Sequence, residues 1–166
     1  MAGCYHRHMK FEHLITINDP ANPLLEPLTR AQLWHGLLQR VDNPLLFLPG
    51  LQSFTLLERS EVHARRELDF GAARIVDSVR LEAGQQVEFV VETGAGHAGG
   101  SLCIRIEEPA PEVLFLRFTY HTNLAENGGE DAAYVDYVKS AYLDSDIECV
   151  RTIRELLATG QLHGVQ

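Results

Sequence analysis

The middle of the chain is a row of short segments that are separated by breaks too short to hold a crossover helix. Six segments with strand character follow one another between residues 51 and 121, and glycine, proline or asparagine marks the breaks. Parallel neighbours need a connection of about a dozen residues, whereas antiparallel neighbours need only a tight turn. This part of the chain therefore predicts an antiparallel meander. The expected strands cover 51–58, 62–70, 73–81, 86–93, 100–107 and 112–121.

A further strand and helical patterns flank this meander. Residues 10–18 form a first expected strand, and Thr29 is then a good N-cap for an amphipathic helix. A second short helical turn is expected from Asn43-Pro44 to Pro49-Gly50. A long helical stretch, 131–158, ends at Gly160 and is long enough to cross a whole sheet. This order predicts an α+β fold with the helices gathered on one face of the sheet.

Length and charge limit the number of domains and the classes of partner. The chain has 166 residues and a formal net charge of −9, which indicates a single domain over 9–166 behind a frayed tail, 1–8. Either Met1 or Met9 is the natural start. An acidic chain without a basic cluster is a poor partner for nucleic acid or an anionic membrane. No stretch is apolar enough for a membrane span or a signal peptide, so we expect a cytoplasmic protein.

The cysteines and the glycine-rich motif predict neither a cofactor nor a metal. Cys4, Cys103 and Cys149 are odd in number and lack CxxC spacing, so reduced thiols are expected. The segment 94–99 matches G-x-G-x-x-G, but the residues after it read as a strand. A dinucleotide site needs a helix N-terminus at that point, so we interpret the segment as a hairpin tip. The rest of the chain has no metal-binding spacing of histidine and cysteine.

Strand alternation and hairpin register together indicate which side chains face inward. A turn at Gly71-Ala72 places Arg66 opposite Asp77 on the inner face. Two inner rows are expected across the meander, namely Val79, Phe89, Ile104, Leu116 and Asp77, Val91, Leu102, Phe118. On the outer face, Glu88 is expected opposite Arg105, beside a row of Val90, Cys103 and Arg117.

Arg66 and Asp77 interrupt an otherwise aliphatic inner face, and two interpretations remain open. The pair is either a structural ion pair near the sheet margin or a functional pair. In the functional case, Arg66 holds a carboxylate or enolate oxygen of a ligand. Because a buried ion pair is not a reliable source of stability, stability alone does not explain this pair, and the functional interpretation remains open.

The inward stripe of the long helix is small and polar in its middle, at Ser145 and Cys149, which predicts a cavity beneath the helix. Asp146 lies beside this stripe. It is either an exposed carboxylate or a buried acid that titrates near neutrality. His13 lies on the inward alternation of the first strand, as a core histidine or as a catalyst.

Several sequence motifs resemble those of a known superfamily. They are Ile17-Asn18-Asp19-Pro20, Leu28 to Trp34, Asn43-Pro44 with Phe47, the strand of Arg66, and Ala141-Tyr142 through Asp146-Ile147 to Arg154. With the order of elements, they resemble the AtaL-like branch of the START/SRPBCC superfamily, which includes the birch-pollen allergen group and polyketide cyclases. The resemblance implies a helix-grip fold, in which a seven-stranded curved antiparallel sheet wraps around a long C-terminal helix above an apolar cavity. It implies a lipid or polyketide as ligand but no particular reaction.

Three functions follow as hypotheses. The first is binding of a small hydrophobic or aromatic molecule between the sheet and the long helix. Its expected binding residues are Arg66, Asp77, Phe89, Val91, Leu102, Phe118, Tyr120, Tyr142 and Trp34. The second is an enzyme of cyclase, dehydratase or isomerase type, with Asp77, Asp146 or His13 as proton shuttle and Arg66 as oxyanion stabiliser. The third is a homodimer that packs through an outer strip of Leu14, Val113 and Phe115.

Overall fold

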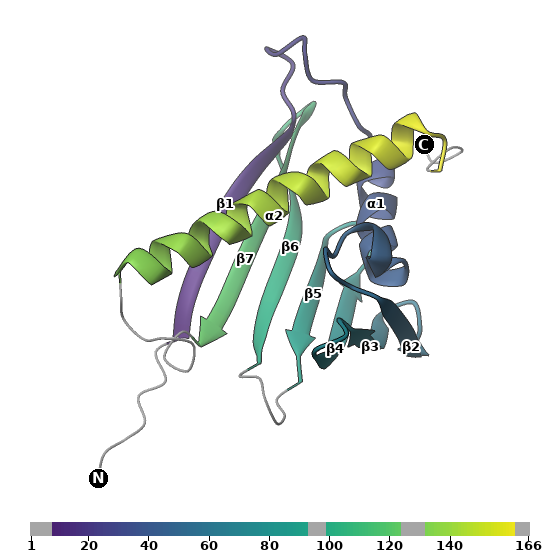
Figure 1. The fold of residues 1–166 in the computed structure, drawn as a ribbon. Helices are drawn as coiled ribbons and strands as arrows, with labels where there is room; N and C mark the ends of the chain where they lie inside the picture. The colour runs from purple at the N-terminus through teal and green to yellow at the C-terminus, as the bar shows by residue number, and fades with distance from the viewer. Residues whose placement is uncertain (1–7, 93–98, 124–131, 162–166) are drawn as a thin grey trace.

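The structure is a computed structural model, and it describes residues 8–92, 99–123 and 132–161. One sheet holds all the strands, and both α-helices lie on the same face of it (Figure 1). In chain order the elements are β1 (His8–Asn18), α1 (Arg30–Asp42), η1 (Pro44–Leu46), β2 (Ser53–Arg59), β3 (His63–Asp69), β4 (Arg74–Glu82), β5 (Gln86–Val91), β6 (Gly100–Ala110), β7 (Val113–Asn123) and α2 (Ala132–Ala158).

The seven strands are antiparallel in the order β1-β7-β6-β5-β4-β3-β2, so β1 and β2 form the two edges. The long helix α2 crosses the inner face of this curved sheet, and α1 packs beside its C-terminal half (Figure 1). This confirms the α+β fold and the helix-grip arrangement. Most element boundaries agree with the expected ones within two residues, although His8, expected in the tail, already pairs with Asn123.

Helix α1 begins where the sequence predicts. The Thr29 hydroxyl accepts a hydrogen bond from the backbone N–H of Gln32, and the Gln32 side chain accepts one from the N–H of Thr29. The buried stripe of the helix includes Gly36. A Cβ atom at Gly36 would lie 2.5 Å from a side-chain carbon of Ile153, so glycine permits the close approach of α1 and α2.

The register is confirmed in two hairpins and wrong by two residues in the next two. Arg66 pairs with Asp77, and Val79 with Phe89, as expected. Phe89, however, pairs with Leu102 instead of Ile104, and Ile104 pairs with Phe118 instead of Leu116.

The error has a local cause in each hairpin. Strand β6 begins pairing at Gly100, which adopts a positive φ, so Glu88 lies opposite Cys103 and not Arg105. The β6–β7 turn is tight, with Glu112 at φ 65° and an irregular step before Ala110. A slip of two residues keeps every side chain on its predicted face.

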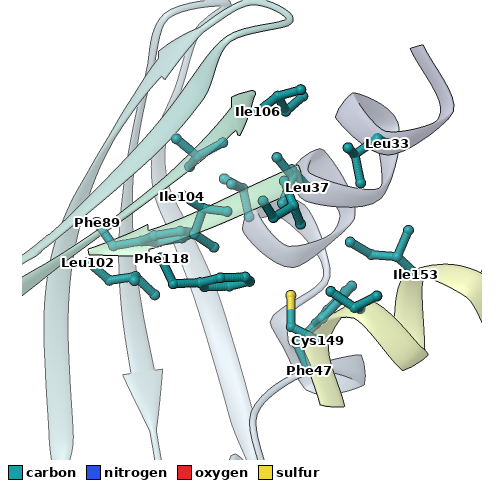
Figure 2. Close-up of a cluster of buried hydrophobic side chains, with 14 of the residues drawn as sticks. Leu33, Leu37, Phe47, Phe89, Leu102, Ile104, Ile106, Phe118, Cys149 and Ile153 are labelled. Carbon is teal, nitrogen blue, oxygen red and sulfur yellow. The ribbon is translucent and has the colours of Figure 1, made fainter. Parts of the chain in front are cut away.

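The core lies between the sheet and the two helices. Figure 2 shows Leu33 and Leu37 of α1 and Cys149 and Ile153 of α2 facing Phe89, Ile104 and Phe118 of the sheet. These side chains are at most 7% exposed. The C-terminal half of α2 is thus closed against the sheet and α1.

The described residues include two of the three cysteines. Cys103 and Cys149 are free thiols, while Cys4 and the tail up to residue 7 lie outside the described residues. Residues 94–98 of the glycine-rich motif also lie outside them, and β6 follows the motif where a nucleotide site would need a helix. Within the described ranges, no helix has the length and apolarity to cross a membrane.

Candidate functional site

Arg66 and Asp77 form a two-pronged ion pair inside the molecule. Nε and Nη2 of Arg66 donate to the two carboxylate oxygens of Asp77, at 2.9 and 2.5 Å. Both side chains are buried, at 3% and 5% exposure. Nη1 of Arg66 donates to the backbone carbonyls of Arg40 and Val41, at 3.1 and 3.2 Å. The pair therefore fastens the C-terminal end of α1 to β3 and β4, with four of the five N–H donors of Arg66 engaged.

A second guanidinium, that of Arg40, lies nearby on α1. The Arg40 side chain lies over the ring of Phe89, 5.6 Å from its centroid, and Arg66 lies 5.1 Å from the same centroid. Arg40 is only 7% exposed. Among the described residues, no carboxylate or carbonyl accepts a hydrogen bond from its guanidinium, whose other close neighbour is the sulfur of Cys149.

Asp146 is buried on α2 and joins two neighbouring strands. Its Oδ2 lies 2.9 Å from Nδ1 of His13 on β1, and its Oδ1 accepts a hydrogen bond from the hydroxyl of Tyr120 on β7. The Asp146 side chain is 1% exposed, so the exposed alternative considered for it is wrong. His13 faces inward, with its side chain 8% exposed.

The electrostatic surroundings favour the neutral forms of several groups. Burial raises the pKa of the Asp146 carboxyl above its ordinary value, and the hydrogen bonds from Tyr120 and His13 only partly oppose this. Burial, together with the nearby Asp146, raises the pKa of the Tyr120 hydroxyl. Burial also raises the pKa of the Cys149 thiol, against the effect of Arg40. The carboxyl of Asp146 is therefore the group placed to exchange a proton at a pH above its ordinary range.

The other ring nitrogen of His13 has no partner. Nε2 is buried and accepts or donates no hydrogen bond among the described residues. Nδ1 is occupied by Asp146, which orients the ring. The arrangement leaves one imidazole nitrogen in the interior, available for a molecule bound there.

Aromatic rings form a wall beside this histidine. Tyr120 and Tyr142 stack with their centroids 4.0 Å apart and an interplanar angle of 3°, so the wall joins the sheet to α2. Phe11 meets Tyr142 edge-on at 5.8 Å. Both tyrosines were expected as binding residues, and the structure brings them into direct contact.

The predicted binding residues lie on the inner face but differ in how far they are closed off. Phe118 is fully buried, whereas Phe89, Leu102 and Tyr120 keep 7 to 8% exposure. The partly exposed members are Val91, Trp34 and Tyr142. On α2, Val135, Val138 and Ser145 are also partly exposed, in contrast to Cys149 and Ile153. The inward stripe of α2 is therefore more exposed in its N-terminal half than in its C-terminal half.

Arg40 was missed by the sequence analysis. It follows Leu33 and Leu37 at helical spacing, so it belongs to the buried stripe of α1. A charged residue on an apolar stripe is the signal that could have identified it. We define the polar cluster beneath α2 as Arg40, His13, Tyr120 and Asp146, which come from four different elements.

Other features of the described chain lie apart from this cluster. A surface cleft of about 530 Å³ is lined by Asn18, Pro20, Leu28, Arg30 and other residues near the β6–β7 turn, none of them a predicted site residue. On the outer face, Leu14 is 47% exposed, and Val113 and Phe115 are partly buried. Within the described residues, no group of three or more His, Cys, Asp or Glu side chains is placed to hold a metal ion.

Comparison with known proteins identifies similar proteins at the level of family and fold. A family model described as acetylaranotin biosynthesis cluster protein L (AtaL) matches residues 15–160. No curated protein sequence matches the chain.

Solved structures with a similar fold include Ara h 8.0201 and an aromatase/cyclase. Ara h 8.0201 has a TM-score of 0.60 at 15% identity, over 92% of this chain and 99% of that one. The Zhui aromatase/cyclase from Streptomyces sp. R1128 has a TM-score of 0.62 at 13% identity, over 95% and 98%. The Aha1 dimer from Colwellia psychrerythraea has a TM-score of 0.57 at 13% identity, over 87% and 96%. At these identities, the likeness concerns the fold alone.

Proposed function

This chain belongs to the AtaL family and has the helix-grip fold, and we propose that it binds a small hydrophobic or aromatic molecule between the sheet and α2. The observation that carries the proposal is the polar cluster beneath α2. Four polar side chains from four elements converge in an apolar interior; His13 has a buried ring nitrogen without a partner among the described residues, and Arg40 has no carboxylate or carbonyl acceptor there. A few convergent polar groups among apolar walls are typical of a ligand site.

Apolar side chains surround the polar cluster beneath α2. Phe89, Leu102 and the stacked Tyr120 and Tyr142 offer flat apolar surfaces beside the cluster. Phe89, Leu102 and Tyr120 keep 7 to 8% exposure, and the inward stripe of α2 carries the partly exposed Ser145 instead of a large aliphatic residue. Arg66 and Asp77 border the site and hold the end of α1 that carries Arg40.

A matched pair of serine variants tests this proposal. Ser145→Phe places a ring in the proposed site, whereas Ser140→Phe places the same ring on an exposed position of the same helix. We expect Ser145→Phe to weaken binding of Nile red, a neutral apolar dye, with a change in unfolding free energy below about 1 kcal/mol. The Ser140→Phe variant should bind the dye like the wild type.

The opposite result has a clear physical meaning. If Ser145 lies in a packed core, the added ring overfills it and destabilises the fold by about 1 to 3 kcal/mol. Such a loss with unaltered dye binding would contradict a binding site beneath α2.

A second candidate function is proton transfer, and the orientation of His13 favours it. When the carboxyl of Asp146 is ionised and accepts from Nδ1–H, the buried Nε2 is unprotonated and has no partner among the described residues, as a general base requires. A bound ketone with an acidic C–H next to its carbonyl would lose that proton to Nε2 and form an enolate. Arg40 is the cation of the polar cluster that would stabilise the enolate oxygen.

Deuterium exchange tests this second function directly. The probe is 2-tetralone in D₂O, with exchange at the carbon next to the carbonyl followed by NMR. We expect the wild type to accelerate exchange and His13→Gln to lose most of the acceleration, while His35→Gln, at an exposed position of α1, keeps it. Equal rates for the wild type and His13→Gln would exclude His13 as the base.

A further inference from the structure

We propose that the bound molecule carries a carboxylate and that Arg40 is the residue that binds it. This inference rests on the proposed binding site beneath α2 and specifies the chemical class of its ligand. The ligand would be an apolar, preferably aromatic, monocarboxylic acid.

The two buried arginines differ in their hydrogen-bond partners. Arg66 has a carboxylate on two of its nitrogens and two backbone carbonyls on the third. Arg40 is buried to a similar extent, but among the described residues no carboxylate or carbonyl accepts a hydrogen bond from its guanidinium, whose neighbours are the Phe89 ring, the Cys149 sulfur as a weak acceptor, Tyr120 and Asp146. A buried guanidinium without a carboxylate partner is costly, so a carboxylate bound to Arg40 would stabilise it.

Positive charge gathers around the ring of Phe89. Two guanidinium groups lie within 5.6 Å of the centroid of this ring, and the carboxylate of Asp77 is bound to one of them. The carboxyl oxygens of Asp146 are directed to His13 and Tyr120, away from a hydrogen bond with Arg40. Asp146 acts on the charge of Arg40 without a hydrogen bond to it, so no carboxylate among the described residues is bound to the Arg40 guanidinium.

The shape of a carboxylate fits the guanidinium of Arg40. A carboxylate has two oxygens in one plane and matches the planar fork of a guanidinium, as the Arg66 and Asp77 pair already demonstrates in the same interior. One unpaired guanidinium balances a monoanion and not a dianionic phosphate. The apolar part of the acid would then lie on Phe89, Leu102 and Tyr120, next to the unpartnered Nε2 of His13.

The experiment compares two probes of the same size that differ in charge. The first is 2-naphthoic acid, and the second is its neutral analogue 2-naphthamide, each titrated calorimetrically at pH 7. A charge-assisted hydrogen bond to a buried guanidinium should give the acid an advantage of about tenfold or more in affinity. Arg40→Met should abolish that advantage and keep the binding of the amide. The control Arg74→Met, at an arginine whose side chain is 70% exposed, should keep the preference for the acid.

A stability measurement separates this role from a structural one. If Arg40 serves the ligand, Arg40→Met removes an unpaired buried charge, and the variant should unfold at the same urea concentration as the wild type or a higher one. If Arg40→Met is instead unfolded, Arg40 is structural and the proposal is wrong. Arg40→Lys keeps the charge without the fork, so it should show a smaller preference for the acid than the wild type does.

The possible failures are distinguishable. Equal affinity of the wild type for the acid and the amide would overturn the assignment of a carboxylate and leave the proposed hydrophobic site intact. No binding of either probe, together with no binding of Nile red, would overturn both. A preference for the acid that survives in Arg40→Met would assign the carboxylate to a different cation and refute the role of Arg40.

Discussion

Removing the carboxylate of Asp77 should destabilise the fold far more than removing a similar carboxylate at the surface. In Asp77→Ala, the guanidinium of Arg66 keeps its bonds to the carbonyls of Arg40 and Val41 but loses both bonds to a carboxylate. The side chain of Arg66 is 3% exposed, so water cannot replace the lost partner. A buried ion pair that loses one member typically destabilises by about 3 to 5 kcal/mol, which is the loss expected here.

A neighbouring ion pair supplies the matched control. Arg65, next to Arg66 on β3, also binds a carboxylate in two-pronged fashion, with distances of 2.7 and 3.0 Å to Glu92. The two side chains are 39% and 38% exposed, so solvent screens the interaction. Glu92→Ala should therefore lower the free energy of unfolding much less than Asp77→Ala, although the two pairs have the same hydrogen-bond geometry.

The assay is urea unfolding at pH 7, followed by the fluorescence of Trp34, the single tryptophan. The double variant Arg66→Met, Asp77→Leu removes both charges, so it should be more stable than Asp77→Ala alone. Equal losses in Asp77→Ala and Glu92→Ala would refute the conclusion that burial makes the inner pair critical. A double variant less stable than Asp77→Ala would place the main role of Arg66 in its bonds to α1.

Three further predictions concern single positions. Because burial raises the pKa of Asp146 above the ordinary value of about 3.9, the wild type should lose stability relative to Asp146→Asn as the pH rises from about 4, measured by urea unfolding at several pH values. A pH dependence equal to that of the exposed variant Asp144→Asn would contradict this. Gly36→Ala brings a methyl group within 2.5 Å of Cγ2 of Ile153, so its melting temperature should drop, and the drop should be smaller in an Ile153→Ala background, which lacks both Cγ atoms. The Cys149 thiol, 2% exposed and with a raised pKa, should react with a thiol reagent only after unfolding, and reaction in the native protein at the rate of a free thiol would show that it is accessible.

Alternation along the strands was sufficient to predict which face each side chain occupies. The period of two residues fixes the face, and the tight turn at Gly71-Ala72 also fixes the partner of Arg66. In the two later hairpins, the partner depends on where pairing begins after a loop and on an irregular step near Ala110. Those details depend on backbone conformation at Gly100 and Glu112, which alternation does not encode.

The candidate site was predictable only in its parts. The inward positions of His13 and Tyr142 follow from strand and helix periodicity. Their meeting with Asp146 and Tyr120 depends on the path of α2 across the sheet, which brings together residues separated by 133 positions in the chain. The proposed role of Arg40 depends on the absence of a carboxylate or carbonyl acceptor for its guanidinium among the described residues. This absence can be recognised only once the neighbours of the residue are known.

The most direct test of the central claim is the location of a bound apolar molecule by methyl NMR. Nile red would be titrated into protein labelled at its leucine and valine methyl groups. Binding beneath α2 predicts shifts that are largest at Val91 and Leu102 on the inner face and small at Leu14 and Val113 on the outer face. Shifts confined to Leu14 and Val113, with none at Val91 and Leu102, would contradict the internal site and place the binding surface on the outside of the sheet.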